Sequence, residues 1–429
     1  MVSEWTSKPL EACMAAIIDY RGKTPHKTAS GIPLITAKIV KDGRIEPPEE
    51  FIAEDDYEAW MRRGMPKPGD VVLTTEAPLG EVAQLGSVRV ALAQRLIALR
   101  GRPGVLDNTF LKFLMRSAGV QHQLRARASG TTVLGIKQSE LRKITLTLPP
   151  FKEQRAIARI LGTLDDKIEL NRQMNETLGG VAGALFKSWF MDFDPVRAKA
   201  EGRDPRLPKN LFDRFPDSFQ DSELGEIPRG WSVGSIADIA GINARTLRRD
   251  DSLNVIDYVE ISEVMRGEIG NIVRYQRDSE PSRARRRLKH GDTALSTVRP
   301  DRGAYFLALN PPETLVASTG FAVLSPRDGN WAFLYCAVTR SEVGEQLGRL
   351  ADGGAYPAIR PDIVGNLPVV LPHSPTISAA FERLARPLFE KTAQNRLQSA
   401  TLAMVRDALL PKLVSGELRI PHIERNLGG

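Results

Sequence analysis

The spacing of apolar residues predicts two long amphipathic helices. Over residues 157–189, apolar or small residues recur at alternating steps of four and three, which is the seam of a heptad repeat. Asn171 and Asn175 interrupt this seam, and a second seam over residues 377–409 is also polar in its middle. Each helix could pack on its own domain. The matching polar interruptions favour an antiparallel coiled coil of the two helices, because buried polar residues can face one another and set the register.

The segments before the two helices have the patterns of strands and turns. Residues 70–74 and 144–148 form continuous or alternating apolar runs typical of strands, and residues 110–115 and 331–338 are expected to be helical. These patterns predict a mixed α/β domain in front of each helix. Residues 191–229 contain five prolines and little periodicity, which predicts an extended, semi-rigid connection.

The chain carries an internal duplication. Matching residues recur in one order, 222–226 positions apart. Coincidence between common strand and turn patterns would not preserve the order, so we infer two copies of one unit. The matched positions include Trp5 and Trp231, Gly69-Asp70 and Gly291-Asp292, Gly130 and Gly353, Ile136 and Ile359, Lys137 and Arg360, and the sequences LTLP at 146–149 and VVLP at 369–372.

Together these patterns predict an α+β fold. It consists of two similar mixed α/β domains separated by two long antiparallel helices that form a coiled coil, with a pseudo-two-fold internal repeat. The predicted boundaries are 1–149 for the first domain, 150–190 for the first helix, 191–229 for the Pro-rich connector, 230–372 for the second domain, 373–421 for the second helix and 422–429 for the tail.

The composition points to a basic intracellular protein. The formal net charge of +7 fits a polyanionic partner, because lysine and arginine neutralise phosphates and release counterions. Cys13 and Cys336 are far apart and form no disulfide framework, which favours a reducing compartment. No apolar run approaches the ~18 residues of a membrane span. The N-terminus does not resemble a signal peptide, so we expect a cytoplasmic location.

Several catalytic motifs are approached but not completed. Gly22-Lys23-Thr24 resembles the end of a phosphate-binding loop, but Ile17 stands where the first glycine of that motif belongs. Residues 310–313 resemble the Asn-Pro-Pro-aromatic motif of adenine methyltransferases but end in glutamate. Asp165-Asp166-Lys167 has the acidic-x-Lys spacing of metal-dependent nucleases but lies in the first heptad seam, where a solvated charged face is expected. The histidines lack metal-ligand spacing. We therefore expect no catalytic residue and no metal ligand in this chain.

Four strings of sequence resemble the specificity subunits of Type I restriction–modification systems. They are LPPFKEQRAIARIL at 148–161, SWFMDFDPV at 188–196, SELGEIPRGW at 222–231 and LLPKLVSGEL at 409–418. The sequence DYRGKTP at 19–25 fits this family as well, so the resemblance covers essentially the whole chain. One departure is that Thr376-Ile377 stands at the start of the second helix where the first helix has Glu153-Gln154.

The resemblance implies a DNA-recognition subunit without an active site of its own. Residues 1–149 and 230–372 would be target recognition domains, each reading one half of a split sequence in double-stranded DNA. The helices would dock two methyltransferase subunits, and the assembly would recruit two ATP-driven restriction subunits, with no membrane involved. S-adenosylmethionine, ATP and magnesium would belong to those partners. The helices carry more apolar surface than one seam explains, and we assign this excess to methyltransferase docking: Phe186, Trp189, Phe190, Leu410 and Leu413.

Two pairs of loops are candidates for reading base edges. Residues 75–80 and 298–303 follow the Gly-Asp strands at matching positions but differ in sequence, and loops at 129–132 and 353–356 precede the matched isoleucines. Ordinary surface turns are the alternative for these loops, as solvated faces are for the basic cluster at 283–290. The candidate DNA contacts are Arg21, Lys23, Thr75, Glu76, Thr131, Thr132, Lys137, Arg283, Arg286, Arg299, Arg302, Tyr356 and Arg360.

Two other classes of protein fit part of this pattern. One is a self-contained DNA methyltransferase or nuclease with duplicated DNA-binding domains, and cofactor binding by the isolated chain would favour it. The other is a structural adaptor that binds only protein. Indifference to DNA at every salt concentration would favour the adaptor, because phosphate contacts make DNA binding depend on salt.

Overall fold

The computed structural model describes residues 5–20, 24–130, 132–204, 206–352, 354 and 357–420. Its contacts divide the chain into two compact units. Unit 1 comprises Met1–Leu170 and Gln398–Gly429, and unit 2 comprises Asn171–Leu397. The unit boundaries fall inside the two long helices, so each helix contributes one part to each unit.

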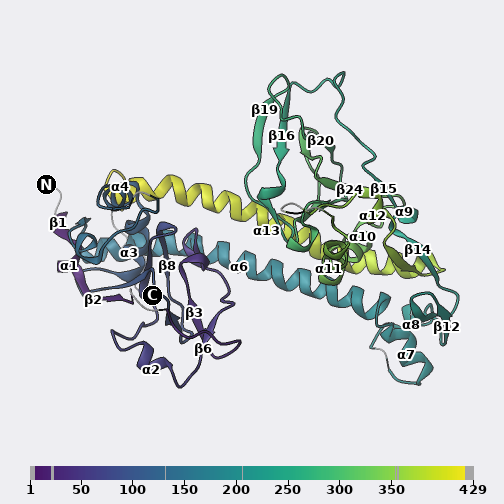
Figure 1. Ribbon diagram of the computed structural model, residues 1–429, viewed down its shortest axis with the longest axis horizontal. Helices are drawn as coiled ribbons and strands as arrows, with labels where there is room; N and C mark the ends of the chain where they lie inside the picture. The colour runs from purple at the N-terminus through teal and green to yellow at the C-terminus, as the bar shows by residue number, and fades with distance from the viewer. Residues whose placement is uncertain are drawn as a thin grey trace. The chain divides into compact units, whose positions relative to one another are not determined.

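Unit 1 is built on a four-stranded antiparallel sheet with the order β2-β10-β7-β8, whose edge strands β2 and β8 are labelled in Figure 1. Successive side chains of a strand point to opposite faces, and Val71 and Val72 accordingly lie in two different cores. One core is shared with two helices, and the other lies beneath a second small sheet. The central sheet strands are β2 (Met14–Asp19), β7 (Val71–Thr75), β8 (Leu79–Gln84) and β10 (Leu96–Gly101).

Shorter elements complete unit 1. The second sheet has the order β6-β3-β9, and the outermost pair joins β1 to β11. Asp107 caps the first of the two covering helices, since its Oδ1 accepts from the amide of Phe110 at 2.9 Å. The elements are β1 (Thr6–Pro9), α1 (Leu10–Cys13), β3 (Ile32–Ile35), η1 (Ala37–Ile39), β4 (Val40–Lys41), β5 (Arg44–Ile45), β6 (Phe51–Ile52), α2 (Tyr57–Trp60), β9 (Ala91–Leu92), α3 (Asn108–Arg116), α4 (Ala118–Ala126), α5 (Gln138–Leu141) and β11 (Thr145–Leu148).

Unit 2 repeats this topology. Its four-stranded sheet has the order β15-β24-β21-β22, and its second sheet has the order β19-β16-β23-β20. β16 pairs in parallel with β23, as β3 pairs with β9 in unit 1. The elements are β14 (Ser232–Ser235), α9 (Ile236–Ile239), β15 (Ala240–Ile242), β16 (Val255–Val259), η2 (Ile261–Glu263), β17 (Val264–Met265), β18 (Glu268–Ile269), β19 (Val273–Gln276), β20 (Ala284–Arg287), β21 (Asp292–Ser296), η3 (Pro300–Arg302), β22 (Tyr305–Ala308), β23 (Leu315–Ser318), β24 (Phe321–Pro326), α10 (Trp331–Val338), α11 (Ser341–Arg349), α12 (Pro361–Gly365) and β25 (Pro368–Leu371).

The shared strand order confirms the internal duplication and the α+β class. The pairing of β1 with β11 also recurs, as β14 with β25. The main differences are local. The second copy has the additional edge strand β20, and the first has the short helix α2.

The two predicted helices are α6 (Phe151–Phe190) and α13 (Pro375–Ser415). In unit 2 they pack antiparallel. Asn395 Nδ2 donates to Asn175 Oδ1 at 2.9 Å, and the rings of Phe186 and Phe381 lie 5.8 Å apart. A residue nearer the C-terminus of α6 therefore contacts a residue nearer the N-terminus of α13. Asn171 is buried and also donates to the carbonyl of Asn395 at 3.3 Å. The polar interruptions of the two seams therefore face one another, as predicted.

In unit 1 the other parts of the helices meet in the same antiparallel sense. Asp165 pairs with Arg406 at 2.8 Å, and Glu153 lies 3.7 Å from Arg419, which follows the end of α13. The apolar side of this pair is continuous with the core beneath α3, and it includes Leu413, which is 1% exposed. The coiled-coil prediction is confirmed in each unit.

The prediction of an extended connector at 191–229 is wrong. The segment folds into α7 (Asp194–Ala200), α8 (Lys209–Phe212) and a hairpin of β12 (Phe219–Ser222) with β13 (Gly225–Pro228). Pro195 stands in the first turn of α7, where a helix tolerates proline. The spaced apolar side chains of the segment, Phe193, Val196, Phe215 and Ile227, are buried in the core of unit 2. The high proline content led to the prediction of an extended segment, and the sequence pattern gave no sign of this packing.

A buried ion network fastens the helices of unit 1. Asp165 accepts from Lys112 Nζ at 2.7 Å and from Arg406 at 2.8 Å, and Arg116 lies 3.7 Å away. Burial by itself would raise the pKa of Asp165, but the two cations bound to it outweigh this effect and hold the pKa below its ordinary value. The acidic-x-Lys triplet is therefore part of a structural ion network, since its first carboxylate is fully engaged.

Asp165→Asn is expected to destabilise unit 1 by about 3–5 kcal/mol, because it leaves buried cations without their counter-charge. Chemical unfolding of the intact chain measures this change, and Asp166→Asn, at an exposed neighbouring position, is the matched control. The difference between wild type and Asp165→Asn should depend on pH. The stabilisation is present above about pH 4, the ordinary carboxyl pKa, and is lost as pH falls through the lowered pKa of the folded state. Equal stability of the two variants at pH 7 would contradict this role.

Candidate nucleic-acid interface

The two candidate loops of unit 1 are joined into one structure. Glu76, which follows β7, forms a bridge with Gly135, and Gly135 pairs in turn with Ser129. The amide of Ile136 donates to the carbonyl of Thr75 at 3.0 Å. Two loops more than 50 residues apart in the sequence thus present one continuous surface.

The same junction recurs in unit 2. Val298 forms a bridge with Ala358, and Ala358 pairs with Asp352. The amide of Ile359 donates to the carbonyl of Thr297 at 2.8 Å. The junction is therefore a property of the duplicated fold.

One residue of the first loop has a left-handed backbone in both copies. Ala77 has a φ of 45° and Arg299 a φ of 46°, and each precedes a proline, although only the Ala77-Pro78 peptide of these two is cis. Left-handed conformations are uncommon for residues other than glycine, and they cluster at functional sites. At the matching positions, unit 1 carries Glu76-Ala77 where unit 2 carries Val298-Arg299, so the two loops present different hydrogen-bonding groups.

The candidate residues of unit 1 do not all face solvent. Thr75 is 1% exposed, so its hydroxyl cannot contact DNA in this conformation, and its part in the loop junction is its backbone carbonyl. Thr132 and Lys137 are exposed. Glu76 is half-exposed and pairs with Arg95 at 2.8 Å. Sequence patterns missed Arg95, since it precedes an apolar strand without any motif.

In unit 2 the candidates flank the loop junction. Arg299 is partly buried, and its amide donates to the carbonyl of Pro357 at 2.8 Å. Arg302 is exposed at the end of η3. Arg360 is also exposed and lies 3.0 Å from Asp362. Arg21, Lys23, Thr131 and Tyr356 lie outside the described residues.

The basic cluster of unit 2 lies on the edge strand β20. Arg285 is paired with Glu280 at 2.6 Å and Arg287 with Asp251 at 3.3 Å, so both charges are largely compensated. Arg283 is exposed beside them. Arg286 is partly buried, and burial lowers its pKa.

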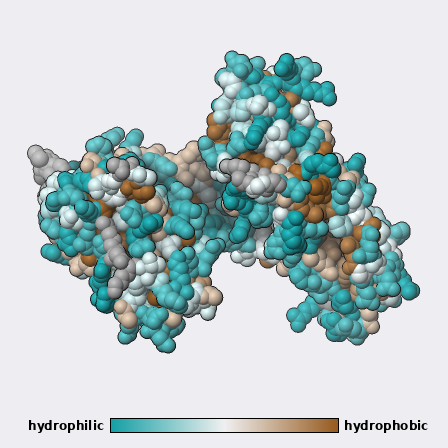
Figure 2. Space-filling model, viewed as in Figure 1, coloured by the Kyte–Doolittle hydropathy of each residue, from teal (hydrophilic) through white to brown (hydrophobic). Residues whose placement is uncertain are grey.

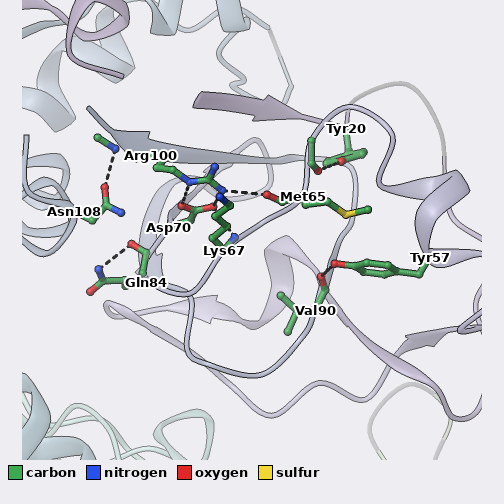
Figure 3. Close-up of polar contacts among 12 residues, drawn as sticks. Tyr20, Tyr57, Met65, Lys67, Asp70, Gln84, Val90, Arg100 and Asn108 are labelled. Carbon is green, nitrogen blue, oxygen red and sulfur yellow. Dashed lines mark hydrogen bonds and ion pairs between the residues drawn. The ribbon is translucent and has the colours of Figure 1, made fainter. Parts of the chain in front are cut away.

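The matched Gly-Asp positions support the strands beneath the loops. Asp70 accepts two hydrogen bonds from Arg100, each 2.7 Å long, and a third from the amide of Lys67 at 2.8 Å (Figure 3). Asp292 accepts from the amide of Lys289 at 2.8 Å, and burial raises the pKa of Asp292 despite nearby Arg245. Both carboxylates are almost fully buried, so they hold the fold rather than face a ligand.

The predicted docking surface is wrong for four of its five residues. Phe186, Trp189 and Phe190 are 3%, 1% and 4% exposed and fill the core of unit 2, and Leu413 is buried in unit 1. Leu410 is partly buried against the same core as Leu413. The apolar excess of the helices packs in the core that contains α10 in unit 2 and in the core that contains α3 in unit 1, so these residues are not available to another protein.

Other apolar residues of the helices are exposed instead. They include Leu170, Met404 and Val405 in unit 1 and Val181, Leu384 and Leu397 in unit 2, with exposures from 43% to 72%. In the space-filling view of Figure 2, hydrophilic residues predominate on the visible face of the molecule.

Among the described residues, no group of three or more His, Cys, Asp or Glu side chains could hold a metal ion. Cys13 and Cys336 are buried, and burial raises the pKa of both thiols. A pocket of about 290 Å³ in unit 1 is lined in part by Tyr20, His26 and Trp60, and by none of the candidate DNA contacts that the structure describes. No helix within the described ranges is long and apolar enough to cross a bilayer.

Comparison with known proteins agrees with this architecture. Residues 23–179 match the model of the Type I restriction modification DNA specificity domain. The chain is 27% identical over 402 residues to the MjaIX specificity subunit of Methanocaldococcus jannaschii, covering 91% of this chain and 88% of that protein. It is 25% identical over 361 residues to the HindI specificity subunit of Haemophilus influenzae, covering 72% and 76%. The crystal structure of a Type I S subunit from M. genitalium shares the fold, with a TM-score of 0.56, 16% identity and 96% of each chain covered.

The structure thus holds two copies of one α+β domain that present different side chains on matching loops. Residues 23–179 match the DNA specificity domain of Type I restriction–modification systems, and the chain is similar over most of its length to specificity subunits of such systems. It is thus the DNA-recognition component of such a system and not its catalytic component. The self-contained enzyme and the protein-only adaptor are not favoured.

Proposed function

We propose that the joined loops of unit 1 read one half of a bipartite DNA target and those of unit 2 read the other. The observation that supports this most directly is the loop junction that recurs in both units with different side chains, Glu76-Ala77 against Val298-Arg299. Specificity for different bases requires different donors and acceptors at the same place in a groove, and such a pair of loops supplies them.

Base contacts and phosphate contacts are assigned to different residues. Arg299 and Arg302 carry the planar guanidinium that pairs with guanine, so we assign them to bases together with Glu76 and Thr132. Arg283 and Arg286, at the edge strand β20, are assigned to phosphates, as are the exposed Lys137 and Arg360. Phosphate contacts fix position and carry no sequence information directly. Arg21, Lys23, Thr131 and Tyr356 remain proposed contacts on the sequence pattern alone.

We propose that the partners are two methyltransferase subunits and two restriction subunits. Similarity to specificity subunits supports this assignment, and the exposed apolar residues of α6 and α13 give the methyltransferase subunits a surface to bind. S-adenosylmethionine, ATP and magnesium are assigned to those partner subunits. We propose that the complex acts in the cytoplasm, where it would reach intracellular DNA.

The test is genome-wide mapping of methylated bases in cells that express the chain with its methyltransferase subunit. A single recurring sequence of two specified halves around an unspecified spacer is expected. The isolated chain should bind DNA less tightly as salt rises, because each phosphate contact releases counterions. Methylation without a recurring sequence, or with one continuous sequence, would contradict the proposal.

A further inference from the structure

Arg95 of unit 1 occupies a strained backbone position. Its φ is +75°, in the left-handed region that residues with a Cβ adopt at a cost of roughly 1–2 kcal/mol. Its carbonyl accepts from the amide of Thr75 at 2.9 Å. In unit 2, Gly320 makes the equivalent contact with the amide of Thr297 at 2.8 Å. Gly320 makes this contact without a left-handed φ, so the contact alone does not require the strained backbone of Arg95.

The side chain of Arg95 stabilises the fold little. It pairs with Glu76 at 2.8 Å, and the two side chains are 50% and 44% exposed. Exposed pairs of this kind contribute little to stability, because water and salt screen them. A strained and weakly stabilising arginine points to a role in binding, since strain of this kind is retained at functional sites.

The surroundings of the pair suit a base edge in a groove. Glu76 is held in place because its backbone is bridged to Gly135, and a Cβ on Gly135 would lie 3.3 Å from the Cβ of Glu76. On the same loop, Val133 and Leu134 are 51% and 52% exposed. Apolar side chains beside a charged pair can contact thymine methyl groups and exclude water when DNA is bound.

The donor and acceptor chemistry selects the base pair. A guanidinium donates to O6 and N7 of guanine, and a carboxylate accepts from N4 of cytosine. These two edges are neighbours within one G·C pair, as the two side chains are neighbours in unit 1. We propose that Arg95, oriented by Glu76, is a specificity-determining residue that reads a G·C pair in the half-site recognised by unit 1. This inference rests on the proposed function of the loops.

Arg95→Gly removes the proposed base contact but keeps the fold, because glycine adopts the left-handed backbone without strain. We expect the melting temperature of the full chain to be unchanged or higher. In complex with the methyltransferase subunit, preference for G·C at one position of one half-site should fall roughly 5- to 150-fold, as for loss of one bidentate base contact. Methylation mapping in cells measures this preference. Arg95→Lys, which keeps the charge but not the planar fork, should be intermediate.

Arg89→Ala is the matched control, since Arg89 is an exposed arginine of unit 1 that lies near Glu54 and over the ring of Tyr57. It should leave the methylated sequence unchanged. An unchanged sequence in Arg95→Gly would overturn the inference, and so would equal weakening at every position, which indicates a phosphate contact. A wild-type complex without a bipartite target would instead contradict the proposed function. The two failures are therefore distinguishable.

Discussion

Exchange of residues 1–149 for the matching domain of another specificity subunit is expected to change one half of the methylated sequence and leave the other half intact. The reason is that the loop junction of unit 1 is built entirely from residues within this segment, between Thr75 and Ile136. Distant sites without shared partners usually contribute additively, so the second half-site should keep its own specificity. Methylation mapping in cells that carry the hybrid measures both halves at once.

The contacts of unit 1 specify how the hybrid should be built. Gln154 donates to the carbonyl of Val105 and accepts from the amide of Asp107, each at 3.0 Å, and any donor domain with the same backbone can make these contacts. Lys112 contacts Asp165 through its side chain, so the donor domain should have lysine at this position. The reciprocal exchange of residues 230–372 is the control and should change only the other half. A change in both halves, or in neither, would rule out one domain for each half-site.

The heptad seams predicted the helices well, because their spacing depends only on which positions are apolar. Residues 150–190 were expected and α6 covers Phe151–Phe190, while α13 ends at Ser415 within the predicted 373–421. The facing asparagines could also be predicted, since a buried amide needs a polar partner. The spacing of an apolar stripe does not show which residues pack against it. Phe190 satisfied the pattern of a docking residue but packs against Phe333 of its own unit, with ring centroids 4.9 Å apart.

The departure at the start of the second helix shows a second limit of sequence patterns. Gln154 bonds to the domain in unit 1, whereas the matching Ile377 is buried among apolar residues. In unit 2, Glu382 has the corresponding role, because it accepts from the amides of Ala332 and Phe333 at 3.3 and 2.8 Å. Glu382 looks like an ordinary solvated helix charge in the sequence, yet it is 4% exposed. Compensation of this kind is visible only when the tertiary contacts are known.

The candidate site was predicted in part. The loops at 75–80 and 129–132 were found separately from their positions in the repeat, but their junction depends on backbone hydrogen bonds that no residue pattern encodes. Arg95 belongs to the site through its φ and its contact with Glu76, both of which are properties of the folded chain. The sequence therefore located the loops without showing which side chains they bring together.

Leu397→Glu and Met404→Glu are expected to prevent methyltransferase binding while the chain stays folded. Leu397 in unit 2 and Met404 in unit 1 are 72% and 66% exposed, so the free chain should tolerate a charge at either position. At an interface, a buried apolar anchor contributes roughly 2 kcal/mol or more, and an unpaired carboxylate there adds a desolvation cost. Each variant should therefore weaken binding at least ~30-fold. Co-purification with the tagged methyltransferase subunit, together with the native mass of the complex, measures the loss.

Two further variants make this test decisive. Gln394→Glu adds the same charge at an exposed polar position of α13, so it should assemble normally. Phe190→Glu places a carboxylate in the aromatic core of unit 2, and it should unfold the chain rather than release a partner. We expect thermal unfolding to change only for Phe190→Glu. The variants at Leu397 and Met404 should stay folded and yet fail to assemble with the methyltransferase subunit. Normal assembly of both of these variants would show that the methyltransferase subunits bind elsewhere on the chain.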